Sequence, residues 1–259
     1  MNISPLAVVH PDAQIGEGVV IEPFAVVEKD VVIGDHCHLY PHAVVLNGAR
    51  IGKNCQIFPG AVVAGIPQDL KFKGEITTAE IGDNTTLREC VTVNRGTASK
   101  GKTEVGSNCL IMAYSHVAHD CKVGDNVIIS NATQLAGEVV VDNYAVIGGG
   151  TLVHQFCHLG AHVMIQGGAL INKDVPPFVK AAREPISYAG VNSIGLRRRG
   201  FSSESIRDIQ DIYRYLYLSG LNVTDAISRI EAELPATPER DEIILFVRNS
   251  KRGIIKGYA

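Results

Sequence analysis

The sequence lacks the features that mark several classes of protein. No apolar run approaches the length that spans a bilayer, and the N-terminus has no basic start before an apolar core. We therefore expect neither stable membrane insertion nor a secretory signal. The net charge of −3 gives no indication of nucleic acid as a partner. The six cysteines include no CxxC pair, which favours buried structural thiols in a reducing, cytoplasmic environment.

What the chain does contain is an aliphatic residue at every sixth position. From Ile3 to Ile171 this series is interrupted only at Asp69, Glu75 and Ser99. A period of six fits neither a helix nor an ordinary strand, and it indicates the hexapeptide repeats of a parallel β-helix. The residue two places before each aliphatic position faces the same way and is almost always small. These small positions include five of the six cysteines, namely Cys37, Cys55, Cys109, Cys121 and Cys157.

The repeats predict the architecture and the domain division. Three hexapeptides form a triangular coil of about 18 residues, and coils stack about 4.8 Å apart. The fold class is therefore mainly β: residues 1–183 form a parallel β-helix, interrupted by polar loops at 64–80 and 94–104. The left-handed sense of the β-helix is inferred from the resemblance to known hexapeptide proteins. Composition leaves open whether these loops carry function or are passive insertions.

Residues 184–259 are expected to form a connector and a small helical domain. Helical patterns run from Ser202 to Ser219 and from about Thr224 to Leu234, and a third begins at Thr237. The simplest role of this domain is to cover the open end of the β-helix, because an exposed strand edge invites aggregation. Binding of a ligand or partner is the alternative.

Residues whose numbers differ by 18 lie in line on neighbouring coils. This spacing places a group of polar side chains along one edge of the prism. His119, Gly137 and Gln155 form one row. Asp120 and Glu138 form another, with their carboxylates expected about 5 Å apart. The complete strip carries His116, His119, Asp120, Gly137, Glu138, His154 and Gln155.

The strip has the parts required for acyl transfer to a hydroxyl or an amine. His119 can act as a general base, and Asp120 can orient it and stabilise the imidazolium. The Gly137 N–H is open to approach and can donate to an oxyanion. No serine or cysteine is placed beside His119, so direct transfer from a thioester is favoured over a covalent acyl-enzyme.

Two other classes of function stay open at this point. His154, His158 and His162 are spaced four apart, but on a triangular coil they cannot converge within one chain. They could still meet a metal between subunits, as in the gamma-class carbonic anhydrases, which share the hexapeptide fold. A scaffold without catalytic activity is the second alternative, and it would not need His119 and Asp120.

Several stretches of the chain are similar to a known family. They are PQDLKF (67–72), ECVTVNRGT (89–97), HVAHDCKVGDN (116–126), VHQFCHLGAHVM (153–164), DVPPFV (174–179) and GVNSIGLRRRGFS (190–202). Together they resemble the bacterial acyl-[acyl-carrier-protein]–UDP-N-acetylglucosamine O-acyltransferases. The resemblance covers nearly the whole chain.

The resemblance implies transfer of a 3-hydroxyacyl chain from acyl carrier protein to the glucosamine 3-hydroxyl of UDP-N-acetylglucosamine, the first step of lipid A synthesis. It implies a homotrimer with sites between subunits, and no cofactor or metal beyond the carrier's phosphopantetheine. The matching roles are general base for His119, its partner for Asp120 and oxyanion donor for Gly137. Substrate contacts match Asp69, Lys71, His116, His154, Gln155, Asn192 and Arg198, and Gly167 matches the position that limits acyl-chain length.

Three positions depart from the family pattern. Glu138 and Asn94 stand where histidine is common, and Ile194 stands where glutamate is common. Glu138 and Ile194 leave the details of sugar and uridine binding open. The acyl-chain length is also undetermined, and an acceptor with a 3-amino group stays an alternative to the 3-hydroxyl.

Overall fold

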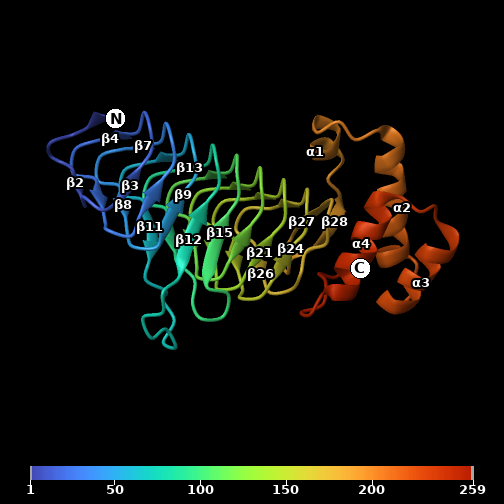
Figure 1. Cartoon of the computed structure of the whole chain (residues 1–259). Helices are drawn as coiled ribbons and strands as arrows, with labels where there is room; N and C mark the ends of the chain where they lie inside the picture. Colours follow the sequence, from blue (N-terminus) through green and yellow to red (C-terminus); the bar gives the residue numbers. More distant parts are fainter. Residues whose placement is uncertain (1, 258–259) are drawn as a thin grey trace.

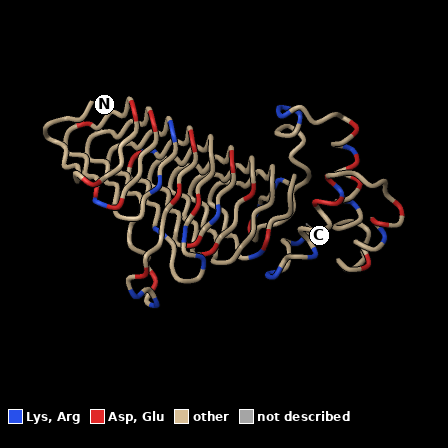
Figure 2. The backbone as a smooth tube through the Cα atoms, viewed as in Figure 1, with Lys and Arg blue, Asp and Glu red and all other residues tan. Residues whose placement is uncertain are grey.

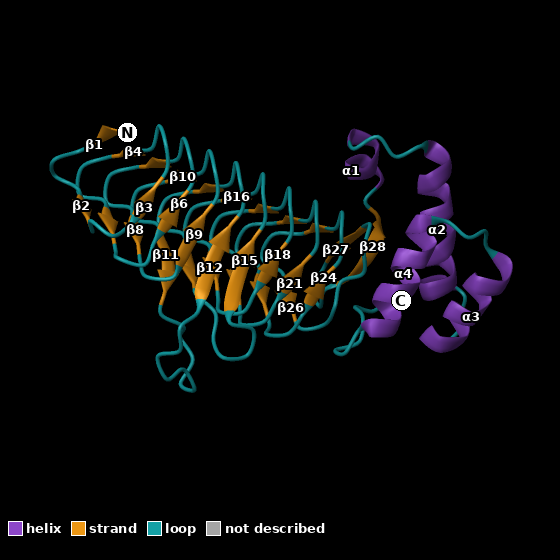
Figure 3. Cartoon of the chain, in the orientation of Figure 1, coloured by secondary structure: helices purple, strands orange, loops and turns teal. Residues whose placement is uncertain are grey.

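The computed structural model describes residues 2–257 and shows a left-handed parallel β-helix with four helices at its C-terminal end (Figures 1 and 3). Short strands stack into three flat faces. Face 1 consists of β1 (Asn2–Ile3), β4 (Val20–Ile21), β7 (His38–Leu39), β10 (Gln56–Ile57), β13 (Thr86–Leu87), β16 (Leu110–Ile111), β19 (Ile128–Ile129), β22 (Val146–Ile147), β25 (Met164–Ile165), β27 (Val179–Ala182) and β28 (Ser187–Val191).

Face 2 consists of β2 (Val8–Val9), β5 (Val26–Val27), β8 (Val44–Val45), β11 (Val62–Gly65), β14 (Thr92–Asn94), β17 (His116–Val117), β20 (Gln134–Leu135), β23 (Leu152–Val153) and β26 (Leu170–Ile171). Face 3 consists of β3 (Gln14–Ile15), β6 (Val32–Ile33), β9 (Ala49–Ile51), β12 (Thr78–Ile81), β15 (Lys102–Val105), β18 (Lys122–Val123), β21 (Val140–Val141) and β24 (His158–Leu159).

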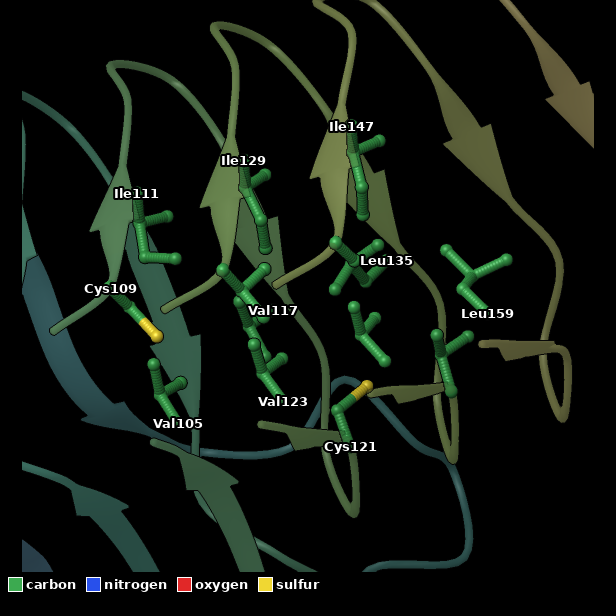
Figure 4. Close-up of a cluster of buried hydrophobic side chains, with 14 of the residues drawn as sticks. Val105, Cys109, Ile111, Val117, Cys121, Val123, Ile129, Leu135, Ile147 and Leu159 are labelled. Carbon is green, nitrogen blue, oxygen red and sulfur yellow. The ribbon is translucent and has the colours of Figure 1, made fainter. Parts of the chain in front are cut away.

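The aliphatic series fills the interior of the prism, as the sequence predicted. Ile111, Ile129 and Ile147 are completely buried, and Figure 4 shows them pointing inward from successive coils. The small positions lie between them, and the thiols of Cys109 and Cys121 face the same interior. Burial raises the pKa of Cys121 to about 12, so this thiol stays protonated and unreactive.

The two loops interrupt the stack at the same edge, where the chain passes from face 2 to face 3. Most coils pair at a spacing of 18, as His116 does with Gln134. The spacing is longer where a loop intervenes, since Gln56 pairs with Thr86 and Thr86 pairs with Leu110. The first loop adds the length of two hexapeptides and the second adds the length of one, so the lattice stays in phase. Strands β11, β12, β14 and β15 extend into the predicted loops, which shortens them to 66–77 and 95–101.

The longer loop projects furthest from the prism, and Figure 2 shows charges of both signs on it. The C-terminal end of the stack is closed differently. Strand β27 pairs parallel with β25 and antiparallel with β28, so face 1 ends in a strand of opposite direction. Beyond β28 the chain forms α1 (Ser193–Arg198), α2 (Ser203–Leu218), α3 (Val223–Glu233) and α4 (Pro238–Asn249).

The helix starts agree with the caps predicted from the sequence. Ser202 caps α2 and Thr237 caps α4, with Pro238 in the first turn. The fully buried Tyr213 of α2 donates its hydroxyl to the Pro177 carbonyl, which fixes the helices to the last coil. Strand β28 and helix α1 were not predicted. Within residues 2–257, no helix combines the length and apolarity required to cross a bilayer.

Candidate active site

His119 and Asp120 form a hydrogen-bonded pair at the edge between faces 2 and 3. His119 Nδ1 lies 2.8 Å from Asp120 Oδ2. An ionised carboxylate only accepts, so Nδ1 carries the proton and Nε2 has a free lone pair. The His119 side chain is 18% exposed and that of Asp120 is fully buried. The pair therefore has the arrangement of a general base with its orienting acid.

The shorter loop holds the Asp120 carboxylate in place. Thr97 donates its N–H to Oδ1 at 2.9 Å and its hydroxyl to Oδ2 at 2.6 Å. The Lys100 N–H also donates to Oδ1, at 3.2 Å. Burial alone would raise the pKa of Asp120, but the hydrogen bonds from Thr97, His119 and Lys100 hold that pKa below its ordinary value of 3.8. Asp120 is thus ionised at neutral pH.

Gly137 lies against the His119 ring on the next coil. A β-carbon at residue 137 would approach His119 Cε1 to 2.6 Å and Nε2 to 2.7 Å. No hydrogen bond among the described residues uses the Gly137 N–H, so this donor is available beside the imidazole. Glycine at residue 137 therefore leaves the space that the ring occupies. Its role as the oxyanion donor stays a prediction.

A hollow of about 600 Å³ opens in front of this pair on face 2. Its lining includes five predicted site residues and one from the longer loop: His116, His119, Gly137, His154, Gln155 and Gln68. His116 Nδ1 lies 2.7 Å from Thr92 Oγ1. Burial lowers the pKa of His116, and neighbouring His119 acts in the same direction, so His116 is neutral at neutral pH.

Other predicted residues lie outside this hollow in the single chain. Asp69 and Lys71 belong to the longer loop, where the Lys71 N–H donates to Asp69 Oδ1 at 2.9 Å. Asn192 and Arg198 line a second hollow of about 630 Å³ on face 1, beside α1. Asn192 also caps α1 and donates its side-chain amide to the His162 carbonyl at 2.9 Å.

Gly167 lies at the edge between faces 1 and 2 and lines neither hollow. A β-carbon there would lie 3.0 Å from the Gly149 carbonyl oxygen on the preceding coil. Close stacking of coils is therefore one reason for glycine at residue 167. Its role as the limit of the acyl chain stays a prediction.

The two carboxylates of the strip take different partners. Asp120 is buried beneath the loop, whereas the Glu138 side chain is 23% exposed and accepts from Ser99 Oγ at 3.1 Å. The backbones do lie on neighbouring coils, since the Glu138 N–H donates to the His119 carbonyl at 3.0 Å. The expected row is present, but the acids do not act as a pair.

The three histidines considered for a metal separate as the coil geometry required. His154 lines the hollow, His158 pairs with Asp142 on face 3, and His162 stacks on Tyr144 at the edge between faces 3 and 1. Over residues 2–257, no three metal-binding side chains converge within this one chain.

Sequence reasoning missed Thr97, Ser99 and Lys100 as parts of this edge. Their contacts with Asp120 and Glu138 span 20 to 39 residues and cross an insertion that breaks the regular coil spacing. The stretch ECVTVNRGT ends at Thr97. Its last residues form the start of the loop, and this position was the only signal.

Comparison with known proteins identifies related families over both parts of the chain. A family described as "Bacterial transferase hexapeptide (six repeats)" matches residues 30–65 and 102–137. Residues 174–255 match domain 2 of "Udp N-acetylglucosamine O-acyltransferase". An acyl-[acyl-carrier-protein]–UDP-N-acetylglucosamine O-acyltransferase of Alkalilimnicola ehrlichii is 45% identical over 98% of this chain and 99% of its own.

Solved structures agree over the full length. The UDP-N-acetylglucosamine acyltransferase of Bacteroides fragilis is 56% identical, with a TM-score of 0.96 over 98% of this chain and 100% of its own. The similar protein from Acinetobacter baumannii is 39% identical, with a TM-score of 0.95 over 99% of this chain and 100% of its own. Both the helical region and the β-helix are therefore shared with these enzymes.

Proposed function

Because the chain belongs to the family of acyl-[acyl-carrier-protein]–UDP-N-acetylglucosamine O-acyltransferases, we propose that it carries out the first step of lipid A synthesis. The reaction moves a 3-hydroxyacyl chain from acyl carrier protein to the glucosamine 3-hydroxyl of UDP-N-acetylglucosamine. The observation that carries the mechanism is the His119–Asp120 hydrogen bond of 2.8 Å at the wall of the hollow.

His119 Nε2 takes the proton of the acceptor hydroxyl as its oxygen attacks the thioester carbonyl. Asp120 keeps Nδ1 protonated and stabilises the imidazolium that forms. The Gly137 N–H donates to the oxyanion of the tetrahedral intermediate. Collapse breaks the carbon–sulfur bond, and the imidazolium returns its proton to the departing phosphopantetheine thiolate. No covalent acyl-enzyme is needed.

A second copy of the chain completes this site. His119 and Gln155 line the hollow on face 2, whereas Asn192 and Arg198 line the hollow on face 1. These are different sides of one prism, so a nucleotide held by Arg198 would be presented to His119 of a neighbouring copy. An arginine fork suits a diphosphate. The expected homotrimer gives this arrangement.

The test is mass spectrometry of products from UDP-N-acetylglucosamine and a panel of 3-hydroxyacyl carrier proteins. A 3-O-acyl product that depends on His119 supports the proposal. Preference for the 3-amino analogue of the sugar would replace the O-acyl assignment by N-acyl transfer. Absence of acyl transfer to either sugar would overturn the proposal.

A further inference from the structure

The shorter loop holds Asp120, and its residues Ser99 and Lys100 also contact Glu138 on the following coil. Lys100 Nζ donates to the Asp120 carbonyl at 3.1 Å and lies 3.8 Å from Glu138 Oε2. Ser99 Oγ donates to Glu138 Oε1 at 3.1 Å. Two residues of one loop thus connect the coil that carries His119 with the coil that carries Gly137.

We propose that Lys100 is a positioning residue, which ties the loop to both coils of the site and offsets the charge of Glu138 beside His119. Glu138 occupies the strip next to Gly137 and bonds to the His119 backbone. Its carboxylate adds a negative charge at the edge where His119 must be neutral to act as a base. Lys100 supplies the matching positive charge and keeps that carboxylate directed toward the loop.

The charged and titratable groups around His119 allow this effect to be isolated. They are Asp120 and His116 on its own coil, Lys100 on the loop, Glu138 on the next coil and His154 on the coil after that. Asp120 is held ionised by its hydrogen bonds, and burial keeps His116 neutral. Lys100 and Glu138 form the one opposite-charge pair in this set outside the dyad itself, so the two charges can be removed singly or together.

The experiment follows the acid limb of the pH profile of kcat/KM in the full-length enzyme. Lys100→Met leaves the negative charge of Glu138 unbalanced, so the acid limb should move upward by roughly half a pH unit, the order of effect of one nearby charge that is partly screened by solvent. Glu138→Gln leaves Lys100 unbalanced and should move the limb downward. In the double variant the acid limb should return close to its wild-type position. In Lys100→Arg, which keeps the positive charge, the limb should stay at the wild-type position.

Lys102→Met is the matched control, because Lys102 directly follows the same loop but pairs with Glu80 and Glu104 on face 3. The acid limb of the kcat/KM profile of Lys102→Met should stay at its wild-type position. An unmoved limb in Lys100→Met, or shifts of the same sign in Lys100→Met and Glu138→Gln, would overturn the proposal. It rests on the proposed function because His119 is the general base proposed there. Failure of that assignment would appear separately, as turnover that persists in His119→Ala.

Discussion

Gly137 and His119 are packed so closely that the imidazole occupies the place a side chain at 137 would need. The missing β-carbon would lie within 2.7 Å of two His119 ring atoms. A β-carbon at residue 137 would press on a ring that is held by its hydrogen bond with Asp120. We therefore expect Gly137→Ala to lower kcat by at least ten-fold with little change in stability.

The measurement for Gly137→Ala is steady-state kinetics beside a thermal unfolding curve. Gly220→Ala is a useful control for the general effect of replacing a glycine, because Gly220 lies after α2 and a β-carbon there meets nothing within 4 Å, although its φ of +73° adds backbone strain. A fully active Gly137→Ala enzyme would show that the ring has room to move without loss.

His119→Ala removes the proposed base. We expect kcat to fall by roughly 10²–10⁴, the range for loss of a general base, while the fold persists. Circular dichroism and the oligomeric state serve as controls for folding. Turnover close to that of the wild type would eliminate the mechanism.

Arg198→Ala tests the hollow on face 1. Arg198 lines that hollow, and its neighbour Arg197 does not. Arg198→Ala should raise KM by several-fold or more for UDP-N-acetylglucosamine or the acyl carrier, because a charge-assisted bond to phosphate is lost. Arg197→Ala is the matched control. Equal KM values in both variants and the wild type would exclude Arg198 from binding.

Gly167→Met tests the limit on acyl length. If the tunnel passes this edge, donor preference should shift to shorter chains with the sugar KM nearly constant, since each lost methylene contact costs about 0.8 kcal/mol. A competition assay over donor lengths measures this. The alternative is that residue 167 is glycine for close stacking of the coils, because a β-carbon there would lie 3.0 Å from the Gly149 carbonyl oxygen. If stacking dominates, activity falls equally on all donors or the protein unfolds at lower temperature.

His162 gives a prediction on pH and stability. Burial, with a smaller effect from Arg199, lowers the pKa of His162 from 6.5 to about 4. The folded pKa lies below the unfolded one, so the stabilisation is complete above pH 6.5 and is lost as the pH falls toward 4. His162→Phe keeps an aromatic ring beside Tyr144 and Phe178. Its unfolding free energy should fall less than that of the wild type between pH 6.5 and 4. Parallel curves of unfolding free energy against pH for the two proteins would contradict the lowered pKa of His162.

The sequence predicted the β-helix well because the lattice is local and repeats. Its three exceptions, Asp69, Glu75 and Ser99, are the lattice positions that lie within the two inserted loops. The row from His119 through Gly137 follows from the same spacing. The hydrogen bonds from Thr97 to Asp120 cannot be predicted from this spacing, because an inserted loop has no repeat that places its residues. Helix α1 spans only 6 residues, which is too short for a helical pattern to emerge from the sequence.

The antiparallel strand β28 has a consequence for the length of the molecule. Parallel coils can be added to a β-helix wherever the last coil offers an edge in the same direction. Strand β28 reverses that direction, and the helices follow it, so no further coil can continue from the C-terminal end of face 1. At the other end, the first coil keeps Leu6 and Val8 more than half exposed. The stack therefore has a fixed stop at one end, whereas an extra coil of three hexapeptides joined ahead of β1 would meet an edge of matching direction.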